Sequence, residues 1–308
     1  MHNISYANKI SLIHVKFIRV ELAISIFIKY KTFRMSVGRK MKNHFPISRT
    51  AIAALTRLTL LESWRGRSGS FLLIALIAIQ IITSLVTEMA VTESLELRLT
   101  TSAFLYRMCL IFALGVSMIA SVVREHESGF VHVLLAHPIS RVQYVLGRIL
   151  GYSITALIAA LSVMLVMAIW VPMAQWSALL LWSISLWLEL IVTGAVALFF
   201  ALGLRNMVGS MVMWLAFYIL ARVLDVARTM AATPIGQDPT GFQAVAGQWM
   251  FQLMGWVIPP LGSFTRAEWL LGNIVPSPQT CGILAVWALV YAVICVVASA
   301  IDFYRHEI

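Results

Sequence analysis

The sequence predicts an all-α polytopic membrane protein, with six transmembrane helices preceded by a cytoplasmic interfacial amphipathic helix. Of its 308 residues, 60% are hydrophobic and only 12% are charged, whereas soluble domains carry about 25% charged residues. The apolar residues are gathered in long runs, and about 20 helical residues are enough to cross a bilayer. A soluble globular fold is therefore excluded.

The first part of the chain is basic. Residues 1–70 hold 13 of the 23 Lys and Arg residues, a bias that sets topology and attracts anionic membrane lipid. No basic-aromatic motif accompanies this charge, so we expect no nucleic-acid partner. We expect residues 1–48 to form a basic N-terminal extension that is disordered or lies upstream of the true start, since Met35 and Met41 are alternative initiators. The membrane domain would then span 49–308.

An amphipathic helix is predicted over residues 51–67, immediately before the first span. Leu55, Leu58 and Leu61 recur there at helical spacing, with Glu62 beside them. Such a helix would lie along the cytoplasmic interface of the membrane.

Six apolar runs follow as predicted spans, at 71–89, 103–123, 149–171, 178–202, 208–224 and 282–302. Lys and Arg collect before the first span, between the second and third, after the fourth and at the C-terminus. This asymmetry predicts that both termini are cytoplasmic in a multi-pass protein of the inner (plasma) membrane. Residues 225–281 form the predicted outer segment, and its apolar part, 248–260, is too short to span.

The most informative stretch is the polar segment 124–147 between the second and third spans. It has a charged start, a leucine-containing middle and the helix-breaking residues Pro138 and Gly147. We expect a helix from Glu125 to Leu135 that offers a docking surface to a soluble partner. The plainer alternative is a solvated loop.

This segment resembles the corresponding region of type 2 ABC transporter permeases. Its matching residues are Glu125, Glu127, Gly129, Leu134, Leu135, Pro138, Ser140, Arg141, Tyr144, Gly147 and Arg148. Arg148 replaces the lysine usual in that family, and Phe130-Val131-His132 replaces a more polar opening. The six-span topology over 50–308 agrees with the resemblance.

The resemblance implies a permease subunit, with a coupling helix at about 124–147 seated on a separate ABC ATP-binding subunit. It assigns ATPase coupling to Glu125, Glu127, Gly129, Leu134, Leu135, Pro138 and Arg141. It also implies export and a permease homodimer or heterodimer. The chain has no Gly-x-x-x-x-Gly-Lys-Ser/Thr loop, so ATP would bind the partner, and we expect neither enzymatic activity nor a cofactor in this chain. A membrane scaffold or assembly factor without its own transport path is the alternative function.

Charged residues within the spans are costly and are often functional. Glu189 either lines a translocation path or pairs with Arg107 or Arg222, or else it is protonated and hydrogen-bonded within the bundle. Arg107 is expected to reach the membrane interface by snorkelling. His126, His132 and His137 lack the spacing of a metal site, so no metal is expected. No catalytic triad or paired-carboxylate site stands out in the sequence, so no catalytic residue is expected either. Gly147-x-x-x-Gly151 predicts close helix packing.

Overall fold

The computed structural model describes residues 49–65, 67–88, 94–129, 140–232, 258–259, 261–272 and 278–305. All of them belong to one unit, Ser48–Ile308. The predictions for the extension 1–48 and for most of the apolar run 248–260 lie outside the described residues.

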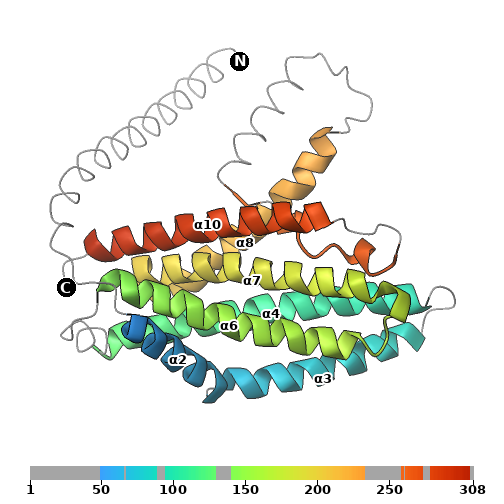
Figure 1. Cartoon of the computed structure of the whole chain (residues 1–308), viewed down its shortest axis with the longest axis horizontal. Helices are drawn as coiled ribbons and strands as arrows, with labels where there is room; N and C mark the ends of the chain where they lie inside the picture. Colours follow the sequence, from blue (N-terminus) through green and yellow to red (C-terminus); the bar gives the residue numbers. More distant parts are fainter. Residues whose placement is uncertain are drawn as a thin grey trace, which may run out of the picture. The chain divides into compact units, whose positions relative to one another are not determined.

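The described residues are almost entirely helical (Figure 1). In chain order these are α2 (Arg49–Arg65), α3 (Arg67–Glu88), α4 (Ser94–Glu127), α6 (Arg141–Met167), η1 (Met173–Gln175), α7 (Trp176–Leu204), α8 (Met207–Ala232), η2 (Leu261–Ser263), η3 (Ala267–Trp269) and α10 (Pro278–Arg305).

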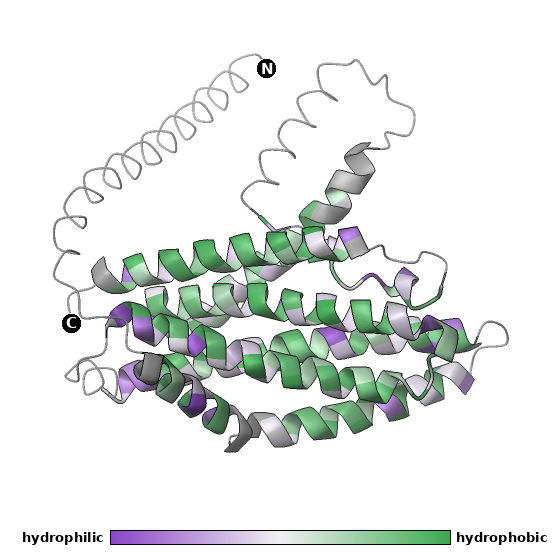
Figure 2. Cartoon of the chain, viewed as in Figure 1, coloured by the Kyte–Doolittle hydropathy of each residue, from purple (hydrophilic) through white to green (hydrophobic). Residues whose placement is uncertain are grey.

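Six of the described helices are long and apolar enough to cross a membrane, and they confirm the six predicted spans. They cover Gly69–Glu88, Ser94–Glu127, Arg141–Met167, Met173–Leu204, Met207–Leu224 and Gln279–Phe303. Figure 2 shows hydrophobic residues along these helices. Helix α8 continues past its span to Ala232, so the first residues of the predicted outer segment 225–281 extend this helix.

Helix α7 lies at the centre of the packing and contacts α4, α6, α8 and α10. In its span window 67% of the residues are buried, against 17% in the windows of α3 and α10. Its sequence is apolar on every side, as expected for a helix surrounded by other helices. The exposed Leu, Ile and Val side chains of α3 and α10 suit contact with lipid, which is as apolar as they are.

Helix α2 packs on the first half of α6 through the two glycines singled out in the sequence. A Cβ atom on Gly147 would lie 2.5 Å from Leu55 Cβ, and one on Gly151 would lie 2.5 Å from Thr59 Cβ. The close packing predicted for Gly147-x-x-x-Gly151 is confirmed.

The predicted leucine face of this helix is only partly right. Leu55 is buried, but Leu58 and Leu61 are 39% and 44% exposed. The helix buries Leu55 and Thr59 instead, because these two residues fit over the glycines of α6.

Glycine is also required where α7 crosses α6, and this gives a first prediction. A Cβ on Gly194 would fall 2.0 Å from the ring of the buried Tyr152. Because a buried ring has little room to move, we expect Gly194→Ala to lower the free energy of unfolding by about 1–3 kcal/mol. Thermal stability of the purified protein in detergent, followed by size-exclusion chromatography, measures the change.

The matched control is Gly282→Ala, since a Cβ on Gly282 in α10 meets nothing within 4 Å. That variant should be unchanged or more stable, by up to about 1 kcal/mol. Equal stability of the two variants would contradict the packing described here.

Candidate functional site

The polar segment 124–147 begins inside α4. Glu125 and Glu127 lie in the last turn of this helix, which ends at Glu127. Gly129 has a φ of 71°, and its N–H donates to the carbonyl of His126 at 3.2 Å, so it terminates the helix in the manner that glycine favours. The predicted continuous helix from Glu125 to Leu135 is therefore wrong, because the chain turns at Ser128 and Gly129. Leu134, Leu135 and Pro138 lie outside the described residues.

The last residues of the segment form the start of α6. Ser140 caps this helix: its Oγ accepts a hydrogen bond from the Gln143 N–H at 3.2 Å, and the Ser140 N–H donates to Gln143 Oε1 at 2.8 Å. This reciprocal pair is a capping box. The Ser-x-x-Gln pattern was visible in the sequence and would have set the start of α6 at Arg141.

Five side chains from three helices meet just inside this end of the bundle, and we call them the Arg148 cluster. The Arg148 guanidinium on α6 donates to Glu62 Oε2 on α2 at 2.9 Å and to Ser121 Oγ on α4 at 3.1 Å. Ser121 Oγ in turn donates to Glu62 Oε1 at 2.8 Å. Arg148 also forms an ion pair with Glu125 on α4, and the Tyr144 hydroxyl donates to Glu125 Oε2 at 2.6 Å.

The two acidic residues at the start of the segment, Glu125 and Glu127, differ in their contacts. Glu125 is engaged by Arg148 and Tyr144, and its side chain is only 12% exposed. Glu127, two residues later, is exposed. Of the two, Glu127 takes part in no ion pair of the described residues, so its carboxylate can meet a partner without breaking one.

The same end of the bundle is joined to α10 through Phe303. The ring of this fully buried residue lies 5.9 Å from the ring of His126 on α4 and 5.8 Å from that of Tyr144 on α6. The guanidinium of Arg141 lies over the same ring, 5.3 Å from its centre, and donates to the Phe303 carbonyl. Both flanks of the polar segment are thus held by the last helix.

A second group of charged side chains, which we call the Glu189 cluster, lies between α4, α7 and α8. Glu189 on α7 is fully buried, and Arg107 on α4 donates to its Oε1 at 2.7 Å. Arg222 on α8 reaches the same oxygen at 3.5 Å. The pairing with Arg107 proposed from the sequence is confirmed, while the snorkelling predicted for Arg107 is wrong, because its guanidinium turns inward to this carboxylate.

The Glu189 cluster also holds the connection that follows η2. Thr265 Oγ1 donates to Glu189 Oε2 at 2.9 Å, and its N–H donates to Ser185 Oγ at 3.1 Å. Arg107 additionally donates to the Leu261 carbonyl at 3.3 Å. Thr265 has a φ of 48°, which is costly for a β-branched residue, and these contacts keep it there.

A comparison with protein-family models identifies the family of this chain. The family model described as "ABC-2 family transporter protein" matches residues 118–305. The chain belongs to this family. The match begins within α4 and includes both flanks of the polar segment, so this ABC-2 protein is a multi-pass permease component of an ABC transporter. No curated protein matches the chain.

No metal centre is formed by the part of the permease that the structure describes, since no three His, Cys, Asp or Glu side chains gather there. Of the three histidines of the polar segment, His132 and His137 lie outside the described residues, and His126 packs on Phe303.

The Arg148 cluster gives a second prediction for the permease. Arg148→Leu removes a buried cation and leaves Glu62 and Glu125 without their shared partner, which should cost about 3–5 kcal/mol of stability. The loss is measured as a lower midpoint of thermal unfolding in detergent. Arg124→Leu is the control, because Arg124 is exposed on the same end, and a similar loss in both variants would argue against the cluster.

The Glu189 cluster gives a third prediction. Glu189→Leu leaves the Arg107 guanidinium buried beside apolar atoms and should cost about 3–5 kcal/mol, whereas replacing both residues, as Arg107→Met with Glu189→Leu, should cost much less. Unfolding midpoints of the two single variants and the double variant test this. A double variant as unstable as the sum of the single ones would show that the two side chains act independently.

Proposed function

We propose that this permease is an exporter driven by a separate ABC ATP-binding subunit, which docks on the polar segment 124–147. The observation that carries the proposal is the Arg148 cluster, which fixes both flanks of this segment to the membrane helices. The family match supports the kind of transporter. The direction of transport follows from the resemblance to type 2 permeases.

A docking element transmits force only if it is stiffly joined to what it moves. The ends of α4 and α6 meet at the Arg148–Glu125 ion pair, and Glu62 extends this contact to α2. Phe303 extends it to α10. Closely packed groups of this kind shift between discrete arrangements rather than deforming gradually. A push on the segment would therefore reach four helices together.

Orientation and assembly complete the proposal. The concentration of Lys and Arg on the side of the polar segment supports a cytoplasmic location for this segment and for both termini, in an inner (plasma) membrane. The active unit would be a permease homodimer or heterodimer with its ATPase subunits, which bind the ATP. Glu189 would reach a translocation path between the two permeases only when the connection at Thr265 moves away from it.

The fourth prediction tests the docking surface with Glu127→Lys. The exposed Glu127 takes part in no ion pair of the described residues, so its reversal should leave folding intact. We expect about ten-fold less ATPase to purify with the variant, because reversing a charge on the docking surface disturbs its charge complementarity with the ATPase, and a ten-fold loss corresponds to about 1.4 kcal/mol. Quantitative mass spectrometry of the purified complex measures the ratio of ATPase to permease.

Glu96→Lys is the matched control, because Glu96 is exposed in the first turn of α4, at the opposite end of that helix. It should retain the ATPase. If the native chain purifies with no P-loop ATPase at all, or if Ser128→Cys is labelled only from outside intact cells, the membrane-scaffold alternative gains and the transporter proposal fails.

A further inference from the structure

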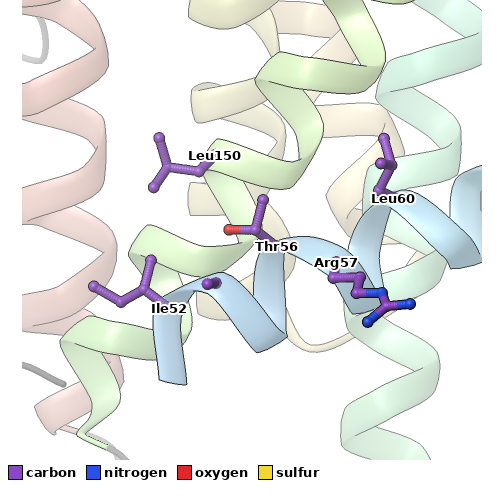
Figure 3. A pocket seen from close by; sticks show the side chains of 6 residues that line it. Ile52, Thr56, Arg57, Leu60 and Leu150 are labelled. Atoms are coloured by element: carbon purple, nitrogen blue, oxygen red, sulfur yellow. The ribbon is translucent and has the colours of Figure 1, made fainter. Parts of the chain in front are cut away.

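A pocket of about 450 Å³ lies between α2 and α6 and has no part in the proposed docking (Figure 3). It is lined by Ile52, Ala53, Thr56, Arg57, Leu60 and Leu150. The glycine contacts bring Leu55 and Thr59 against one face of α6, and Leu150 forms the wall of the pocket beside that contact.

The walls of the pocket are apolar, and the one hydroxyl among them, that of Thr56, already makes a hydrogen bond. Leu150 belongs to the span Arg141–Met167 and is 46% exposed, so we expect this side of the pocket to face the hydrocarbon of the bilayer. Thr56 Oγ1 donates to the Gly147 carbonyl at 3.4 Å. An apolar chain can therefore line this side without leaving a buried polar group unpaired.

Arg57 gives the pocket its charge. It is exposed, and in Figure 3 its guanidinium lies on one side of α2 while Leu60 and Thr56 project from the other. A helix that is apolar toward the membrane and cationic toward water matches the two ends of a phospholipid. A guanidinium can bind phosphate oxygens with two parallel hydrogen bonds.

We propose that this pocket binds an anionic phospholipid, with an acyl chain along Leu60 and Leu150 and the phosphate on Arg57. The charge complementarity favours an anionic headgroup over a zwitterionic one. The bound lipid would touch α2, the helix that supplies Glu62 to the Arg148 cluster. The proposal needs only a membrane-embedded chain, so it stands or falls independently of the ATPase.

The first arm of the test uses the full chain, purified and incorporated into vesicles of equal dioleoylphosphatidylglycerol and dioleoylphosphatidylcholine. Native mass spectrometry then counts the lipids of each class that remain bound. Arg57→Gln should lower the preference for phosphatidylglycerol about five-fold. Arg124→Gln removes an equal charge from an exposed position on the same end and should keep the preference. An unchanged preference in Arg57→Gln overturns the proposal.

The second arm identifies the occupant directly. A benzophenone side chain replaces Ala53, an exposed residue at the edge of the pocket, in the full chain within phosphatidylglycerol vesicles. Irradiation should add the mass of one phospholipid to the peptide that contains position 53. A crosslink to residues 1–48 of the same chain, or to a second copy, would show another occupant and overturn the proposal.

Discussion

The buried guanidinium of Arg148 is the interaction on which this end of the molecule depends. Arg148 is 1% exposed, and an arginine keeps its positive charge in a protein. Burying an isolated cation costs several kcal/mol, which is offset only when anions are held against it. Glu62 and Glu125 provide that charge from two other helices. If α2 or the end of α4 moved away from α6, the Arg148 guanidinium would lose a carboxylate partner and its burial would no longer be offset.

The Glu189 cluster applies the same constraint farther along the bundle. Helix packing in a bilayer gains little from the hydrophobic effect, because lipid solvates an apolar face as well as another helix does. Polar contacts therefore matter more in deciding which helices become neighbours. Arg107 and Glu189 join α4 to α7, and Thr265 adds the connection after η2. Between the two clusters, glycines such as Gly194 and Gly115 allow the close approach of aromatic rings from adjacent helices.

The spans were predictable from sequence because a bilayer imposes their length and apolarity directly on the chain. The pairing of Arg107 with Glu189 was one of the open alternatives, since few partners exist for a charge inside a membrane. The contact between Arg148 and Glu62 was not predicted. These residues are 86 positions apart, and no local pattern indicates that α2 folds back on α6. The prediction that Leu58 and Leu61 share the buried face of the helix was wrong for the same reason. Their spacing indicates a helix, but the glycines of α6 decide which face of it is buried.

The structure also changes what the polar-segment motif means. Gly129 ends α4, Ser140 starts α6, and Gly147 admits α2. Glu125 and Arg148 pair with each other, and Arg141 binds the end of α10. Most of the described motif residues therefore serve to hold the segment in place and are already engaged within the chain. The motif therefore describes how the segment is attached to the membrane helices more directly than which partner it contacts. Under the proposed docking, Glu127, which is exposed and takes part in no ion pair of the described residues, would be the acidic residue of the segment that meets the ATPase.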